Sequence, residues 1–129
     1  MAQPRCFLRE LCKSKNDFVG YCLNGSGDVH VNFRGYPGRI AMPKCRDLST
    51  DRVVPCFSDR RGTKRARGLT ATVYTANQGA DLWHVLYAWQ YHGSLYAVSE
   101  HVTPPLTYTR VRQNLDHLLS SLVLVEPRA

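Results

Sequence analysis

The sequence predicts an α+β domain in which an antiparallel sheet of about five strands carries a C-terminal amphipathic helix on one face. Runs of β-branched and aromatic residues that flank turn sequences indicate strands joined by hairpins. An apolar stripe near the C-terminus, with spacings of three and four residues, indicates a helix that packs on the sheet. The chain has 129 residues, the length of one domain, and we expect residues 1–129 to form a single unit.

The N-terminal segment is expected to form a short helix over residues 4–15. Pro4 suits the first turn of a helix. Phe7, Leu8 and Leu11 then recur at helical spacing. The predicted domain therefore begins with a helix and continues with strands.

The next segment is expected to be a hairpin followed by irregular chain. Phe18–Leu23 has the composition of a strand, and the turn sequence NGSGD follows it. Val29, Val31 and Phe33 then alternate with polar residues, as in a strand with one buried face. Glycines and prolines leave room for no more than a short strand over Arg39–Met42.

Residues 44–68 are predicted to be a long, basic, irregular loop. This range holds eight basic and three acidic residues, shows little periodicity and contains Pro55. Loops of this length inside a compact domain are usually functional or disordered. The basic side chains are Lys44, Arg46, Arg52, Arg60, Arg61, Lys64, Arg65 and Arg67.

A strand is expected at LTATVYTA, and a hairpin is expected over residues 82–102. The periodicity of residues 82–92 fits either a strand or a helix, and the Gly93-Ser94 turn favours strands. In this pairing His92 lies opposite Leu95. Two surfaces remain open to the C-terminal helix: the aromatic face around Trp89, or the face of Leu86 and Leu95.

The C-terminal helix is predicted from about residue 107. Thr107 or Thr109 is a suitable N-cap. The apolar stripe consists of Val111, Leu115, Leu118, Leu119 and Leu122. If this helix does not cover the sheet aromatics, they form an exposed platform suited to stacking on bases. These aromatics are Tyr87, Trp89, Tyr91 and Tyr96.

Composition indicates the cellular location of the chain and the kinds of partner that it binds. The net charge of +7 and the pI near 9.4 favour polyanionic partners. No apolar leader or membrane-length run is present, so we expect an intracellular, cytoplasmic protein, or a nuclear one in a eukaryotic host. Five cysteines, an odd number at long spacings, predict reduced thiols and no metal site or cofactor.

The leading functional hypothesis is a small, non-enzymatic protein that binds nucleic acid or nucleic-acid-handling machinery. Clustered cations neutralise phosphates and release counterions, and all eight basic residues of the 44–68 range are candidate contacts. A merely solvated loop is the alternative interpretation of this cluster.

Two other function classes remain open. One is a protein–protein inhibitor or adaptor of the kind encoded by phages and mobile elements, which meets an acidic protein surface. The other is a small nuclease that uses His84 and His101, which the predicted hairpin makes diagonal neighbours. An exposed sheet edge would also allow a homodimer.

Overall fold

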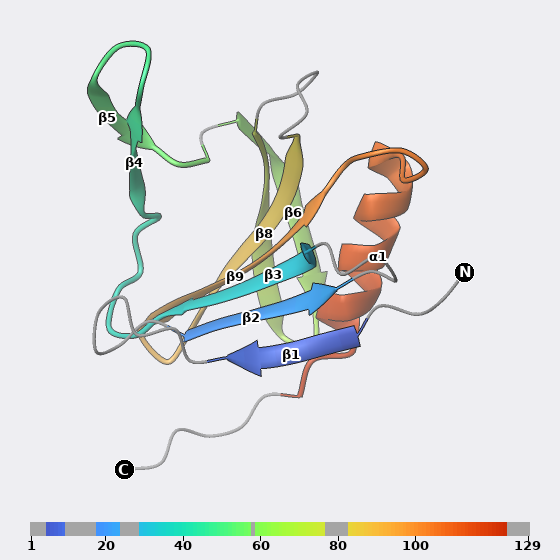
Figure 1. The fold of residues 1–129 in the computed structure, drawn as a ribbon. Helices are drawn as coiled ribbons and strands as arrows, with labels where there is room; N and C mark the ends of the chain where they lie inside the picture. The colour runs from blue at the N-terminus through green and yellow to red at the C-terminus, as the bar shows by residue number, and fades with distance from the viewer. Residues whose placement is uncertain (1–4, 10–17, 24–28, 58, 77–82, 124–129) are drawn as a thin grey trace.

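The protein is an α+β domain with one helix packed against an antiparallel sheet (Figure 1). The computed structural model describes residues 5–9, 18–23, 29–57, 59–76 and 83–123, with side chains from residue 31 onward. The predicted fold class is confirmed, and the sheet has seven strands in this part of the chain.

The sheet consists of two meanders that meet in its middle. In spatial order its strands are β1 (Arg5–Arg9), β2 (Phe18–Leu23), β3 (Val29–Tyr36), β9 (Ser94–His101), β8 (His84–Tyr91), β7 (Leu69–Ala76) and β6 (Asp59–Ala66). A separate hairpin, the arm, is formed by β4 (Lys44–Asp47) and β5 (Arg52–Pro55). The helix α1 spans Tyr108–Ser120.

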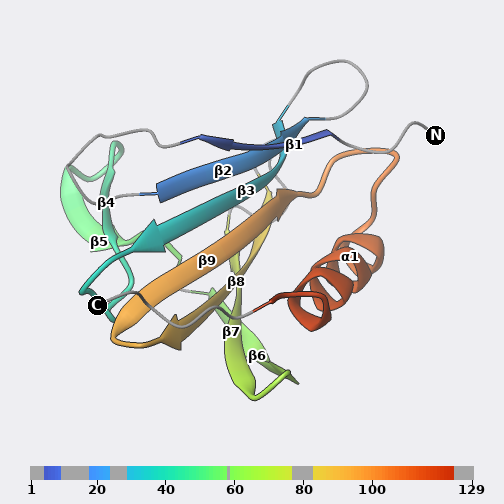
Figure 2. The same ribbon diagram turned by 90° about the horizontal axis from the view of Figure 1, so that it is seen from below.

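The strand order forces one connection to cross the sheet. Because β3 pairs with β9 while β6 lies at the far edge, the chain between β3 and β6 must pass β9, β8 and β7. It passes on the face opposite α1, which we call the open face, where Met42 and Phe57 pack against Leu86 and Ala97. The arm projects from this crossing segment, away from the helix (Figure 2). The crossing segment thereby gives the open face a partial cover.

The helix forms the main core with the aromatic face of the sheet. Val111, Leu115 and Leu119 are fully buried against this face, as the apolar stripe predicts. Thr107 caps the helix: its hydroxyl oxygen accepts a hydrogen bond from the backbone N–H of Arg110 at 3.1 Å.

The aromatic residues of β8 and β9 belong to this core and not to an exposed platform. Tyr87 is 0 % exposed and Trp89 is 7 % exposed. The Tyr87 hydroxyl donates to the carboxylate of Asp116 and accepts from Nε of Arg112 at 2.8 Å, so its polar end is paired with the helix. Of the two surfaces left open by the sequence, α1 covers the aromatic one.

The register of the β8–β9 hairpin differs from the predicted one by two residues. The turn is His92-Gly93, in which both residues have positive φ, 47° and 73°. Such a type I′ turn matches the twist of its strands. A shift of two residues leaves every side chain on its predicted face. It moves His84 from a diagonal position to one directly opposite His101.

The N-terminal helix predicted over residues 4–15 is wrong where the structure describes this range. Arg5–Arg9 forms strand β1, which pairs antiparallel with β2. The free edge of β2 offers a full ladder of backbone partners, and this pairing outweighs a weak helical spacing. Residues 4 and 10–15 lie outside the described residues.

The irregular loop predicted over residues 44–68 is also corrected. It contains the arm and the edge strand β6, which turns into β7 through Arg67 and Gly68 at φ 49° and 74°. A disulfide joins Cys45 to Cys56 at the base of the arm, contrary to the reduced thiols expected there. The short strand considered for residues 39–42 does not form, because this stretch belongs to the crossing segment.

Candidate functional site

The basic cluster divides between the two faces of the edge strand β6. On the helix side, the ammonium group of Lys64 lies 3.9 Å from the carboxylate of Asp116. On the same side, the guanidinium of Arg61 donates to the Asp59 carboxylate at 2.8 Å and to the Thr75 hydroxyl at 3.2 Å. These two cations are engaged with the chain's own acceptors.

Arg60 and Arg65 belong to the other half of the cluster. Arg60 pairs with Tyr74 in the β6–β7 ladder, and Arg65 pairs with Thr70. Directly opposite residues of an antiparallel pair share a face. Tyr74 and Thr70 line a hollow of the open face, so both arginines border that hollow. Both side chains are exposed.

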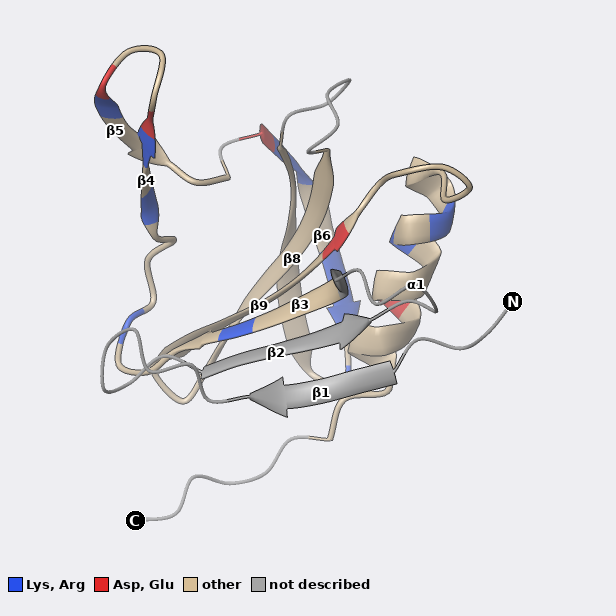
Figure 3. Cartoon of the chain, in the orientation of Figure 1, with Lys and Arg blue, Asp and Glu red and all other residues tan. Residues whose placement is uncertain are grey.

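The remaining predicted cations lie on the arm and at the β6–β7 turn. Lys44 and Arg52 are exposed on the arm (Figure 3). Arg46 pairs with the carboxylate of Asp51 in the same hairpin. Arg67 donates to the backbone carbonyl of Ser120 near the end of α1. The eight predicted site residues therefore do not form one continuous patch.

The open face contains a cleft of about 350 Å³ that the sequence did not reveal. Its floor is low because small side chains, Ala97 and Ser99, occupy the middle of β9. Met42, Phe57 and the Cys45–Cys56 disulfide stand over this floor from the crossing segment. We call this cleft the first hollow.

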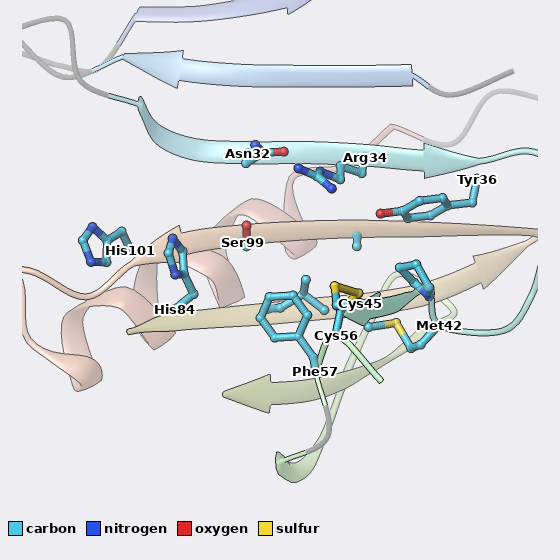
Figure 4. Close-up of a pocket in the computed structure, with 13 residues that line it drawn as sticks. Asn32, Arg34, Tyr36, Met42, Cys45, Cys56, Phe57, His84, Ser99 and His101 are labelled. Carbon is cyan, nitrogen blue, oxygen red and sulfur yellow. A yellow bond between two sulfur atoms is a disulfide. The ribbon is translucent and has the colours of Figure 1, made fainter. Parts of the chain in front are cut away.

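Polar side chains of β3, β8 and β9 line the first hollow (Figure 4). Arg34 and Asn32 enter it from β3. The buried Oδ1 of Asn32 has no hydrogen-bond partner within the described part of the chain. Such an atom is an acceptor available to a ligand. The ring of Tyr36 continues the β3 wall toward the apolar end.

His84 and His101 lie side by side at one end of the first hollow (Figure 4). Their ring centroids are 4.7 Å apart and their planes differ by 17°, so the imidazoles are stacked. The direct cross-strand register of β8 and β9 produces this contact. The predicted proximity of the two histidines is thus observed, in a closer form than a diagonal pair.

A second hollow of about 390 Å³ adjoins the first, and Met42 lines both. Its floor and rim are formed by Thr70, Thr72, Tyr74, Ala88 and Gln90, with other residues of β8 and β9 and the crossing segment. Because they share Met42, the two hollows are neighbours on the open face, and we refer to them together as the groove, between the histidine pair and the edge strand β6.

The charged side chains in and beside the groove are all basic among the described residues. Among the described residues that line either hollow, none is acidic, whereas Arg34 lies in the first hollow and Arg60 and Arg65 border the second. The buried carboxyl group of Glu100 lies on the helix side, where Asn114 donates to it at 3.1 Å. Burial raises the pKa of Glu100 to about 7, although this hydrogen bond and Arg110 oppose the rise.

Sequence reasoning missed the β3 side of the groove. The alternation of β3 puts Asn32, Arg34 and Tyr36 on one face, and this signal was available. What was missing was the position of β3 beside β9 and the crossing of residues 42–57 above them. Neither can be inferred from local periodicity.

No protein-family model, curated protein or solved structure matches the chain. The part of the chain that the structure describes contains no helix long and apolar enough to span a membrane. Within the same residues, no three His, Cys, Asp or Glu side chains gather as metal ligands would.

Proposed function

We propose that the protein binds single-stranded nucleic acid in the groove on the open face. The observation that carries this proposal is a groove with no acidic residue among its described lining, with Arg34 in the first hollow and Arg60 and Arg65 beside the second. A chain of phosphates needs positive charge at successive positions along its path, and this arrangement supplies it.

The rings that line the groove favour a single strand over a duplex. Tyr36 and Phe57 line the first hollow and Tyr74 lines the second. Unpaired bases stack on such rings at about 1–3 kcal/mol each, whereas the bases of a duplex are already stacked on one another. The amide groups of Asn32 and Gln90 add hydrogen bonds to bases or sugars.

The eight residues predicted from the sequence contribute unequally to this proposal. Arg60 and Arg65 contact phosphates, and Lys44 and Arg52 extend the positive field along the arm. Lys64 and Arg61 face the helix side and hold acceptors of the chain itself. The proposed site therefore consists of Arg34 and the open-face half of the cluster, Arg60 and Arg65.

The cellular location remains a prediction from composition. An intracellular, nucleic-acid-binding role agrees with the net charge of +7. The Cys45–Cys56 disulfide argues against an intracellular location, because disulfides persist mainly in oxidising compartments. Whether this bond is present in the isolated protein therefore tests the predicted location.

Fluorescence anisotropy with labelled 20-mers tests the proposal. We expect a single-stranded oligonucleotide to bind more tightly than a duplex of the same sequence, with affinity that falls as salt rises. Equal affinity for the duplex would remove the role of the aromatic rings. An absence of binding at 50 mM salt would overturn the proposal.

A second candidate function is the protein–protein adaptor or inhibitor, and the arm favours it. Leu48, at the tip of the arm, is 92 % exposed, and Val53 is 62 % exposed. In this alternative, these two apolar side chains of the arm would contact the partner protein. In that case Leu48→Ser would abolish a protein complex and leave nucleic-acid affinity unchanged.

A further inference from the structure

Resting on the proposed function, we infer that the His84–His101 pair cleaves RNA in the first hollow. In the reaction, the 2′-hydroxyl of a bound ribonucleotide attacks the adjacent phosphorus. The inference names RNA as the substrate class, because DNA lacks the attacking hydroxyl. It rests on the geometry of the two imidazoles and on the polar groups beside them.

The two rings are close enough to act together on the attacking and the leaving oxygen of one phosphate. Their centroids are 4.7 Å apart in a stacked arrangement. The attacking and leaving oxygens of an in-line displacement have a similar separation, since pairs of metal ions that clamp both oxygens lie about 3.5–4 Å apart. In the proposed reaction each imidazole acts on one of these two oxygens.

The reaction requires a division of roles between the two adjacent rings. One imidazole acts in its neutral form as the general base, and the other acts as the imidazolium general acid. Histidine is the side chain best suited to both roles near neutral pH.

The step balances without a further reactant. The neutral imidazole takes the proton of the 2′-hydroxyl while the 2′ oxygen forms a bond to phosphorus. The bond from phosphorus to the 5′ oxygen breaks, and the imidazolium gives its proton to that oxygen. The products are a 2′,3′-cyclic phosphate and a 5′-hydroxyl end, and the pair ends with its proton on the other ring.

Neighbouring side chains provide the contacts that this reaction requires. Ser99 precedes His101 by two residues and is directly opposite Asn32, so all three line the same end of the first hollow. The Ser99 hydroxyl and the Asn32 amide are donors for the non-bridging phosphate oxygens. The buried Oδ1 of Asn32, unpartnered among the described residues, is an acceptor for a ribose hydroxyl or a base amino group.

The test uses a DNA oligonucleotide with one central ribonucleotide, labelled with a fluorophore and a quencher, in buffer with EDTA. We expect cleavage at that ribonucleotide alone, with a cyclic phosphate identified by mass spectrometry. His84→Gln and His101→Asn should each lower the rate by about 100-fold or more. His117→Gln, an exposed histidine on α1, is the control and should cleave like the wild type.

Anisotropy with the all-DNA oligonucleotide separates this inference from the proposed function. Binding that persists in both histidine variants, with cleavage lost, supports the inference. Binding of the ribonucleotide substrate without cleavage by the wild type overturns the inference and leaves the proposed function intact. Cleavage that both variants retain assigns the activity elsewhere and also overturns it. Thermal unfolding of each variant shows that the fold is kept.

Discussion

The ammonium group of Lys64 on β6 lies 3.9 Å from the carboxylate of Asp116 on α1, on the face of the sheet that the helix covers. The next residue, Arg65, pairs with Thr70 and lies on the opposite face. A cluster that is continuous along the chain is thus divided in space by the two-residue period of a strand. Only one half of it borders the groove.

This division predicts a contrast between two double variants of equal charge. Arg60→Gln with Arg65→Gln should weaken binding of a single-stranded 20-mer about tenfold or more and lower the slope of log K against log salt by about 1.4, which is roughly 0.7 per lost phosphate contact. The measurement is anisotropy at four salt concentrations.

Arg61→Gln with Lys64→Gln is the matched control, because it removes the same charge from the helix side. We expect this variant to change the slope by less than half as much. Equal losses in the two double variants would mean that net charge, and not the groove, determines binding.

Filling the first hollow should block binding without removing any charge. Ser99→Leu places a larger side chain among the residues that line this hollow. We expect affinity for the single strand to fall about tenfold, because a base or sugar no longer fits. Ser120→Leu makes the same substitution on the exposed side of α1 and should bind like the wild type. Unchanged affinity of the Ser99 variant would place the ligand elsewhere.

Glu100 should make the protein less stable as pH rises from about 5 to 7. Burial raises its pKa in the folded protein to about 7, from an ordinary value of 4.5, so the folded state binds the proton more tightly than the unfolded state does. The contribution to stability is present below the unfolded pKa and is lost as the pH rises through the folded pKa, an effect on the order of 3 kcal/mol.

Urea unfolding of Glu100→Gln at pH 5, 6, 7 and 8 measures this effect. The variant should resemble the wild type at pH 5 and exceed it in free energy of unfolding at pH 8. The five histidines are present in both proteins, so the difference between the two curves reports the carboxyl group. A difference that does not change with pH would contradict the assignment.

Loss of the Cys45–Cys56 disulfide should lower the affinity for nucleic acid and have only a small effect on the free energy of unfolding. Among the described residues, none of those buried in the core lies in the arm. We therefore expect the Cys45→Ser, Cys56→Ser variant to lose less than about 1 kcal/mol, below the roughly 3 kcal/mol typical of a closed loop of this size. Affinity should fall several-fold, because Met42 and Phe57, which cover the groove, are less constrained.

Denaturant unfolding and anisotropy on the same samples, with and without dithiothreitol, provide the comparison. Reduction of the wild type should reproduce the double variant. Peptide mass mapping checks that the bond is present in the isolated protein. Global unfolding on reduction would show that the arm belongs to the cooperative core after all.

The strand and helix assignments near the C-terminus could be made from local pattern. The stripe from Val111 to Leu119 and the alternation through Trp89 each place many apolar side chains on one face. Burial of that face stabilises the predicted element. A register error of two residues did not disturb these assignments, because faces repeat every second residue.

The N-terminal strand and the edge strand β6 could not be predicted in this way. Arg5–Arg9 has a short apolar run with no strong period, and β6 is almost entirely polar. Both form because a neighbouring strand presents an unpaired ladder, which is a property of the assembled sheet. Local propensity is a weak determinant when backbone pairing of this extent is available.

By itself the sequence determined the class of the fold, the stripe of α1 that is buried, the positive charge of the protein and the closeness of His84 and His101. These depend on spacings within one segment or across one tight turn. The tertiary structure alone decided which face of the sheet α1 covers, which cations border the groove, and that Arg34 joins them. The reason is topological: with β3 beside β9, residues 42–57 must cross the open face, and their cover over Ala97 and Ser99 creates the first hollow.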